Sequence, residues 1–261
     1  NMSLQEMRTG DSLVILRGMP AESIKVTITS PPYNLGVNYG VYHDKRQHSS
    51  YLEWMHSIFH EVCRTLAQDG HFFLQVGGTP LHPHIPEELL HEALDYFALQ
   101  NTIVWIKALA VGGVSHGHYK PINSPRFLNN TFELIYHLTR TGKSPIDRLA
   151  VGVPYTDRSN TRRWKQHQEK HCAGNCWFIP YDTIQSGDER MKHPAVFPKE
   201  LAKRCILLSG ASSDDLICDP FAGIGTTLLA ARDLGLNALG IDIDPQYVDF
   251  ANQTLGVASN A

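Results

Sequence analysis

The 261-residue sequence contains no apolar run that is long enough to cross a membrane, which argues against an integral membrane protein. It also shows no charged, apolar and small-residue leader, no internal repeat and no low-complexity segment. The five cysteines are odd in number and scattered, so they do not form the disulfide framework of a small secreted protein. Reduced thiols of this kind predict a cytoplasmic protein.

A strong positive charge is missing as well. The formal net charge is −3 and charged residues make up 19% of the chain, so the overall charge does not indicate nucleic-acid binding. One segment differs, because residues 140–170 hold eight Lys or Arg against three Asp or Glu. A local basic surface can bind phosphates on a chain that is acidic overall. The length and the 42% of hydrophobic residues predict one α/β core with room for a small appended lobe.

A stiff loop follows the first apolar run. Residues 24–28 read IKVTI, which is typical of a buried strand, and residues 29–34 read TSPPYN. Two consecutive prolines fix the backbone and remove two donors, so we expect the loop carbonyls to remain available as acceptors. The hydroxyl of Ser30, the ring of Tyr33 and the amide of Asn34 stand beside them. This set suits a planar base with an exocyclic amino group, although Pro-Pro after a strand can also be a simple loop stop.

A glycine-rich turn lies far downstream, where residues 216–227 read LICDPFAGIGTT before a helical run. Gly223 and Gly225 allow a ligand to approach the backbone, and the start of a helix offers N–H groups to an anion. Leu228 replaces the third glycine of the dinucleotide fingerprint. About twenty residues on, the next strand ends in Asp242, an acid suited to ribose hydroxyls. The turn and the acid together predict a site for a nucleoside cofactor.

Together these motifs resemble those of the S-adenosylmethionine-dependent DNA amino-methyltransferases. The Ser-Pro-Pro-Tyr motif precedes the Phe-x-Gly-x-Gly motif, an order similar to the circularly permuted beta class of that family, and the resemblance covers nearly the whole chain. It implies an α/β fold with a doubly wound, mostly parallel, Rossmann-like sheet and a small irregular target-recognition region. The expected parts are a catalytic half at residues 1–140, a target-recognition region at 141–190 and a cofactor half at 191–261.

The resemblance also implies a function. It predicts a site-specific DNA methyltransferase that uses S-adenosylmethionine and acts on duplex DNA after the target base has flipped out. Within that family a serine at the start of the tetrapeptide is more often associated with cytosine N4, so N4 is the predicted acceptor and adenine N6 the alternative. A nucleic-acid-binding protein that has kept the fold without the catalysis is a second alternative. A homodimer and a cognate restriction endonuclease acting on the same site are partners that the sequence leaves open.

Three groups of residues receive predicted roles. The residues expected to bind and orient the target base are Ser30, Pro31, Pro32 and Tyr33. The residues expected at the cofactor are Asp11, His193, Phe197, Asp219, Phe221, Gly223, Gly225, Thr226 and Asp242. The expected DNA contacts, all in the basic segment, are Arg158, Arg162, Arg163, Trp164 and Lys165. Asp11 also fits the N-cap of a helix that begins just after it.

The remaining expectations concern helices, loops and metal ions. Helical spacing predicts a helix over residues 51–68 that ends at Asp69-Gly70 and places Trp54 in the core. Residues 34–50 are expected to form a loop that closes over DNA, and residues 112–120 a flexible loop that faces DNA.

Residues 129–136 resemble the family's element at the base pocket, although Glu133 is equally consistent with a core strand. The cluster His167, His171, Cys172 and Cys176 has ligand types that suit zinc, but its spacing lacks the usual Cys-x2-Cys. We therefore predict no metal, with zinc as the less favoured alternative.

Overall fold

The structure is a computed structural model, and it describes residues 3–34, 38–39, 42–43, 46–80, 82–119, 122–156, 169–180 and 197–256. Its helices are α1 (Ser12–Gly18), α2 (His48–Thr65), α3 (Ile85–Ala93), α4 (Lys199–Ser209), α5 (Thr226–Asp233) and α6 (Pro245–Leu255). The strands of the main sheet are β1 (Gln5–Thr9), β2 (Ile24–Thr29), β5 (Leu66–Val76), β6 (Ala98–Ile106), β9 (Phe132–Thr139), β12 (Cys176–Phe178), β13 (Leu216–Asp219) and β14 (Asn237–Asp242). Three two-stranded ribbons pair β3 (Asn38–Tyr39) with β4 (Tyr42–His43), β7 (Ala108–Val111) with β8 (Val114–Gly117), and β10 (Val153–Pro154) with β11 (Lys170–His171).

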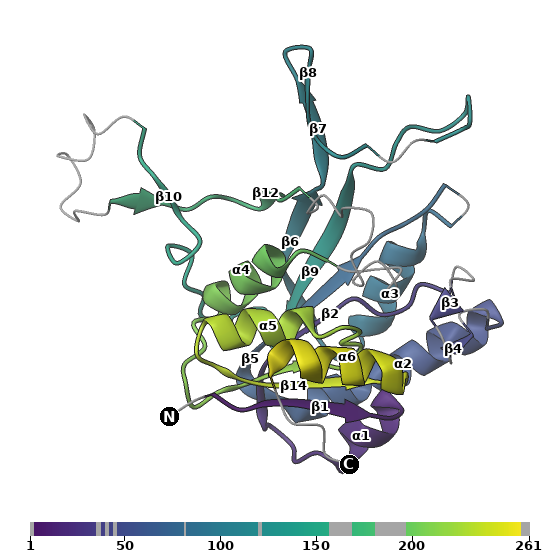
Figure 1. The fold of residues 1–261 in the computed structure, drawn as a ribbon, viewed down its shortest axis with the longest axis vertical. Coiled ribbons are helices and arrows are strands. Elements are labelled where there is room, and N and C mark those ends of the chain that lie inside the picture. The colour runs from purple at the N-terminus through teal and green to yellow at the C-terminus, as the bar shows by residue number, and fades with distance from the viewer. Residues whose placement is uncertain are drawn as a thin grey trace.

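The main sheet has eight strands in the order β1-β14-β13-β2-β5-β9-β6-β12 (Figure 1). Every neighbouring pair is parallel except β5–β9 and β9–β6, since β9 runs against both of its neighbours. The predicted doubly wound, mostly parallel sheet is therefore confirmed. The strand order also shows the permutation, because β13 and β14 from the end of the chain lie between β1 and β2 from its beginning.

Helices cover both faces of the sheet (Figure 1). On one face α4, α5 and α6 pack through apolar residues such as Leu201, Leu228 and Val248 against the sheet. On the other face α1, α2 and α3 contribute Leu16, Phe59 and others to a second buried cluster. The sheet is thus buried on both sides, which accounts for the nearly continuous burial of β2 and of the second half of β5.

The strands that carry the two motifs are neighbours. Ile217 of β13 pairs with Val26 of β2, and Cys218 pairs with Thr27. These two strands are therefore adjacent and parallel in the sheet. Because parallel strands share one carboxyl edge, the Ser-Pro-Pro-Tyr loop after β2 and the glycine turn after β13 leave the sheet side by side.

Two local predictions were wrong. Helix α2 ends at Thr65, and Asp69-Gly70 lies inside β5 instead of ending the helix. Close packing explains this glycine, because a Cβ on Gly70 would lie 2.7 Å from Leu66 Cγ and 3.0 Å from the Lys25 carbonyl oxygen. Residues 112–117 belong to the ordered β7–β8 ribbon instead of a flexible loop.

The segment expected to recognise DNA contributes one strand to the main sheet. This strand, β12, pairs in parallel with β6. Trp177 of β12 is buried, and the guanidinium carbon of Arg204 in α4 lies 5.8 Å from its ring centre. The segment is therefore joined to the main sheet at this strand.

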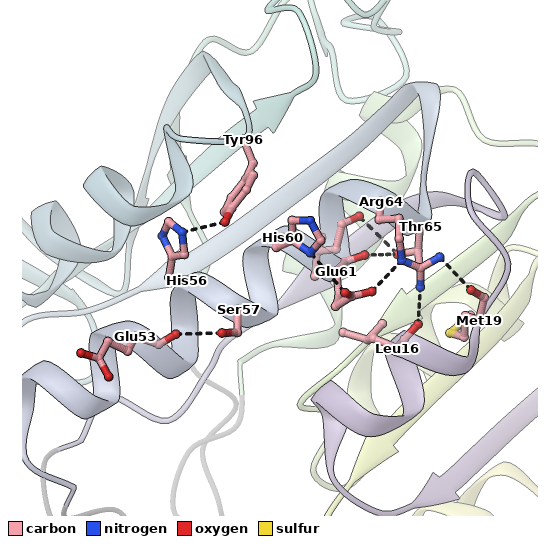
Figure 2. A network of polar contacts seen from close by, with 11 residues as sticks. Leu16, Met19, Glu53, His56, Ser57, His60, Glu61, Arg64, Thr65 and Tyr96 are labelled. Carbon is pink, nitrogen blue, oxygen red and sulfur yellow. Dashed lines mark hydrogen bonds and ion pairs between the residues drawn. The ribbon is translucent and has the colours of Figure 1, made fainter.

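Polar contacts fix the helices of the second face to one another (Figure 2). Near the end of α2, Arg64 donates to the carbonyl oxygens of Met19 at 2.9 Å and Leu16 at 2.7 Å, which holds α1 against α2. The hydroxyl of Tyr96, just after α3, lies 2.6 Å from Nε2 of His56 in α2. These contacts join α1, α2 and the end of α3 into one layer on this face of the sheet.

Candidate active site

A pocket opens at the carboxyl edge where β2, β13 and β14 end. It holds about 930 Å³ of empty space, counting the part that is open to solvent, which suits a nucleoside-sized ligand. Its lining comes from both motifs and from α1, α2 and α6. The lining residues are Asp11, Ser12, Ser30, Pro31, Pro32, Tyr33, Arg46, Trp54, Phe197, Phe221, Ala222, Gly223, Ile224, Thr226, Asp242, Ile243 and Tyr247.

Most of the predicted site residues that the structure describes line this pocket. All four residues expected at the target base do so, and of the cofactor set Asp11, Phe197, Phe221, Gly223, Thr226 and Asp242 do. Asp219 and Gly225 lie behind the wall, and His193 is outside the described residues. The two distant motifs therefore meet in one cleft.

Asp219 ties the motifs together from beneath the pocket. Its carboxylate accepts hydrogen bonds from Thr29 of β2 at 2.7 Å, Thr227 of α5 at 2.6 Å and the Phe221 amide at 3.1 Å. Burial raises the pKa of Asp219 to about 6, against the opposing effect of these donors. Its position predicts that it orients the glycine turn without touching a ligand.

Gly225 serves helix packing in the structure. It caps α5 in the left-handed region with φ 83°, and a Cβ there would lie 3.0 Å from the Ala251 Cβ on α6. The close approach of α5 and α6 sets the position of the helix that starts at Thr226.

Asp242 closes the glycine turn from the end of β14. One carboxylate oxygen accepts from the Gly223 amide at 2.9 Å and the other from the Asp244 amide at 2.9 Å. Burial raises the pKa of this carboxyl, whereas the two amides lower it. Each carboxylate oxygen can accept more than one hydrogen bond, so Asp242 can still accept from a ligand in the pocket.

Asp11 has the N-cap role that the sequence suggested. It caps α1, and its Oδ1 accepts from the amides of Leu13 at 2.9 Å and Val14 at 3.1 Å. It also lines the pocket. The next residue, Ser12, donates to the Pro220 carbonyl oxygen and so joins α1 to the glycine turn.

A chain of polar contacts runs from the Ser-Pro-Pro-Tyr motif into the sheet. Ser30 Oγ and the Tyr33 hydroxyl are 2.8 Å apart, and Tyr33 donates to the side-chain oxygen of Gln75 at 3.3 Å. The Gln75 amide nitrogen donates to Glu133, whose other oxygen accepts from Lys107 Nζ at 2.7 Å. Gln75, Glu133 and Lys107 lie on or next to β5, β9 and β6, so three strands support the motif.

Two of the acceptors expected in the loop already have partners within the protein. The Pro32 carbonyl oxygen already accepts from the Tyr51 hydroxyl at 2.8 Å, which leaves it one lone pair for a further donor. The Asn34 amide pairs with the backbone of Arg46, accepting from its nitrogen at 2.6 Å and donating to its oxygen at 2.9 Å. Both contacts stiffen the loop.

Comparison with known proteins decides what this cleft belongs to. A family model of the N6/N4 methyltransferases, described as DNA methylase, matches residues 24–253. The chain belongs to this family of DNA amino-methyltransferases. Its motif order is that of the beta class.

Individual relatives agree with this assignment. The methyltransferase is 31% identical to the type II methyltransferase M.ScaI of Streptomyces caespitosus over 93% of its own length and 78% of that protein. It is 28% identical to the DNA adenine methyltransferase YhdJ of Escherichia coli K12, over 96% and 82% of the two chains. Its fold is similar to the cytosine-N4-specific PvuII DNA methyltransferase, with a TM-score of 0.71 and 21% identity over 100% and 89% of the chains.

The methyltransferase lines its pocket with residues that sequence patterns did not single out. Trp54 was expected in the core, but it lines the pocket, 5.5 Å from the Phe221 ring and beneath the Arg46 guanidinium at 4.5 Å. Helical spacing could place Trp54 on the inner face of α2, but it could not show that this face extends past the sheet edge. Tyr247 of α6 and Ile243 complete the wall beyond Asp242.

Several predicted residues of the methyltransferase lie outside the described part. These are His167, His193 and all five expected DNA contacts, Arg158, Arg162, Arg163, Trp164 and Lys165. Among the residues that the structure does describe, no group of three His, Cys, Asp or Glu side chains could hold a metal ion. In the same part of the chain, no helix combines the length and apolar character needed to span a membrane.

Proposed function

We propose that the protein transfers a methyl group from S-adenosylmethionine to the exocyclic N4 of a cytosine at a specific site in duplex DNA, after that base has flipped out of the helix. The observation that carries the proposal is the single pocket lined by both motifs, with Ser30 and Tyr33 on one side and Gly223 and Asp242 on the other. A protein that only bound nucleic acid would need neither motif.

The chemistry of the pocket wall fits the cofactor. Asp242 and Asp11 offer carboxylate oxygens to ribose hydroxyls and to an amino group, while Phe221, Ile243 and Tyr247 offer apolar surface to an adenine ring. The amides of the turn are held by Asp219 and Asp242, so the backbone is ordered before a ligand binds. Bound there, S-adenosylmethionine would supply an electrophilic methyl group on its sulfonium.

The directions of the hydrogen bonds leave the Ser30 oxygen free to accept from a ligand, because Ser30 donates its own proton to Tyr33. Glu133 can only accept, so the Gln75 amide nitrogen faces it and the Gln75 oxygen faces Tyr33. Tyr33 then donates its proton to Gln75, and its oxygen accepts the proton of Ser30 at 2.8 Å. The Ser30 oxygen keeps lone pairs for an amino group in the pocket.

An acceptor at this position addresses the difficulty of the reaction. The exocyclic amine of a base is a weak nucleophile because its lone pair is delocalised into the ring. Hydrogen bonds that Ser30 and the Pro31 carbonyl accept from the amine would localise the lone pair and point it at the methyl group. The amine would gain the methyl group as the sulfur–methyl bond breaks, which would leave a neutral thioether on the cofactor. The amine would release one proton to water, so no strong general base is required.

The ring of Tyr33 supports the same base. Stacking of a base on an aromatic side chain contributes roughly 1–3 kcal/mol, which offsets the few kcal/mol that base flipping costs. The Tyr51 contact to the Pro32 carbonyl oxygen and the Tyr33 contacts to Gln75 hold the loop in place for this stacking. Arg158, Arg162, Arg163, Trp164 and Lys165 are proposed to contact the DNA around the flipped base.

Cytosine N4 is preferred because the acceptor is the neutral hydroxyl of Ser30 instead of a carboxylate. Adenine N6 is the second candidate, since the relative YhdJ is named as an adenine methyltransferase. Mass spectrometry of nucleosides from DNA treated with the protein and labelled S-adenosylmethionine separates the two. Labelled N4-methylcytosine is the expected product, and labelled N6-methyladenine would replace cytosine by adenine as the target.

A second experiment tests the catalytic proposal against a protein that only binds DNA. Calorimetric titration with S-adenosylmethionine should show binding to one site per chain. Absence of cofactor binding and of methyl transfer to duplex DNA would leave a silent DNA-binding protein of the same fold.

A further inference from the structure

A rigid β-ribbon stands beyond the main sheet (Figure 1). Strands β7 and β8 pair in antiparallel register from Ala108–Gly117 to Val111–Val114, and Gly112-Gly113 form the two-residue turn. Both glycines have positive φ, 58° and 80°, as tight hairpin turns require. At about 3.4 Å per residue, four residues in each strand extend the ribbon by roughly 13 Å.

The base of the ribbon is fixed to the same strands that support the target motif. The amides of Lys107 and Ala108 both donate to the Thr131 carbonyl oxygen, at 2.7 and 3.3 Å. Lys107 also pairs with Glu133 at 2.7 Å, and Glu133 contacts Gln75 behind Tyr33. The ribbon and the base pocket are therefore parts of one connected support.

The ribbon also rises from the edge of the sheet at which the pocket opens. β5 is parallel to β2, and β9 is antiparallel to both β5 and β6, so β6 runs in the direction of β2. β7 follows the carboxyl end of β6, while the Ser-Pro-Pro-Tyr loop follows the carboxyl end of β2. These two strands are three positions apart in the sheet, about 14 Å at the usual strand spacing.

The tip of the ribbon carries apolar side chains into solvent. Val111 and Val114 face each other across the last pair of the ribbon, and each is 57% exposed. Two exposed β-branched residues on a ribbon with open edges favour contact with another surface. The side chains are small enough to enter between base pairs, as apolar residues do in DNA-binding proteins that unstack a base step.

Charge identifies the surface that the tip meets. From residue 96 to residue 132, a stretch that includes the whole ribbon, the sequence contains no Asp or Glu. The same stretch contains His116, His118 and Arg126, which are exposed, whereas its Lys107 is already paired with Glu133. A stretch without acids and with exposed basic residues suits the phosphates of DNA, and a two-stranded ribbon fits a DNA groove.

We propose that the β7–β8 ribbon inserts Val111 and Val114 into the base stack of the bound duplex next to the target base, and so supports base flipping. This proposal rests on the proposed function, since it assumes a duplex whose target base enters the pocket. The ribbon supplies part of the free energy of unstacking, and the connected support through Glu133 and Gln75 fixes the distance between the tip and the pocket.

The test uses the Val111→Thr/Val114→Thr double variant, which keeps the shape and β-branching of both side chains and replaces two methyl groups by hydroxyls. The methylation site is first mapped by sequencing DNA that the wild-type protein has modified. Methyl transfer is then measured on two duplexes with this site, one fully paired and one with an abasic position opposite the target base. The matched control is Leu94→Ser, a change at an exposed apolar residue at the end of α3.

We expect kcat/KM of the double variant to fall at least tenfold on the paired duplex. On the abasic duplex, where the target base has no pairing partner, kcat/KM should stay within twofold of wild type. The control should match wild type on both. Equal losses on the two duplexes, or no loss on either, would overturn the proposal. If the losses are equal and sedimentation also shows that the double variant has changed from dimer to monomer, the ribbon is a contact between copies of the chain instead of a contact with DNA. Failure of the wild-type protein to methylate any DNA would instead refute the proposed function.

Discussion

The hydroxyl of Tyr33 lies 2.8 Å from Ser30 Oγ, from which it accepts a hydrogen bond, and it donates its own proton to Gln75. Through this contact the tyrosine presents its ring to the pocket and at the same time fixes the rotation of the serine hydroxyl. The proposed stacking surface and the proposed hydrogen-bond acceptor for the target base are therefore oriented by one side chain.

Removal of this hydroxyl in Tyr33→Phe should lower kcat about 10- to 100-fold and leave the affinity for S-adenosylmethionine nearly unchanged. The variant keeps the ring but lets the Ser30 hydroxyl rotate and leaves the Gln75 oxygen without its donor, at a cost of about 1–3 kcal/mol. Single-turnover kinetics and cofactor titration measure the two effects. Tyr96→Phe is the control and should keep wild-type kcat, because it removes a hydroxyl that contacts His56 and neither residue lines the pocket. A large loss of cofactor binding in Tyr33→Phe would contradict the assignment of Tyr33 to the base.

Glu133 should act on the reaction mainly through Gln75. In Glu133→Gln the neighbour of Gln75 can donate as well as accept, so the Gln75 amide loses its single orientation and kcat should fall about three- to tenfold. In a Gln75→Ala background the same change should have a smaller effect, because the side chain that Glu133 orients is gone and only the pair with Lys107 is altered. Rate measurements on the four proteins of this cycle test the order of action. Additive losses would show that Glu133 acts independently of Gln75.

Asp242→Asn should weaken cofactor binding by at least tenfold before it affects turnover at saturating cofactor. Both carboxylate oxygens accept backbone amides, and an asparagine would direct its own N–H groups at one of these donors and disorder the turn at Gly223. Asp244→Asn is the matched control, because asparagine caps a helix as well as aspartate does and can still accept from Gln246. Calorimetric titration with S-adenosylmethionine compares the variants. Equal affinity in Asp242→Asn and wild type would remove Asp242 from the cofactor site.

Sequence patterns predicted the parts of this site that follow directly from strand ends. The Ser-Pro-Pro-Tyr loop, the glycine turn and Asp242 each follow an apolar strand, and parallel pairing brings such ends together. The N-cap role of Asp11 was also predictable, because capping depends on residues that are adjacent in the chain. Patterns of residues that are close together in the sequence were enough to predict these features.

The support behind Tyr33 could not be predicted in the same way. Gln75, Glu133 and Lys107 are far apart in the sequence, and they meet only because β9 runs antiparallel between β5 and β6. Nothing in a single strand pattern shows the register that places Gln75 next to Glu133. The start of β5 at Leu66 could not be predicted for a similar reason. Gly70 looks like a helix end in the sequence, but it is a glycine because Leu66 and Lys25 leave no room for a Cβ.

Folding stability should fall as the pH drops below 6.5 because of a buried histidine pair. His71 Nδ1 lies 2.9 Å from His137 Nε2, and Asn101 donates to His137 Nδ1 at 3.0 Å. Burial lowers the pKa of both histidines, with Lys25 further lowering that of His71 and Asp69 opposing it. The folded protein keeps both rings neutral while the unfolded chain takes up protons near pH 6.5. The contribution of the pair to folding stability is therefore complete above pH 6.5 and is lost progressively as the pH falls below it.

Each proton taken up only on unfolding should cost about 1.4 kcal/mol per pH unit in this range. Urea unfolding at several pH values measures the slope. In His71→Gln one titrating group is gone, so its stability should vary less steeply between pH 6.5 and 5 than that of wild type. The comparison cancels the effect of Asp219, whose raised pKa acts in the opposite direction in both proteins. An unchanged slope would show that the pair does not control acid sensitivity.

Replacing Arg162 and Arg163 by Gln should flatten the dependence of DNA binding on salt. These residues lie outside the described part of the chain, and the prediction rests on the basic excess of residues 140–170. Each lost phosphate contact removes a slope of about 0.9 from the plot of log K against log salt concentration, so two contacts should remove about 1.8. Arg8→Gln is the control, because Arg8 pairs with Glu6 on β1 and should leave the slope as it is. Since phosphate contacts are released by salt whatever the base sequence, the loss should be similar on specific and nonspecific duplexes. A loss confined to the specific duplex would mean that the two arginines read bases instead of phosphates.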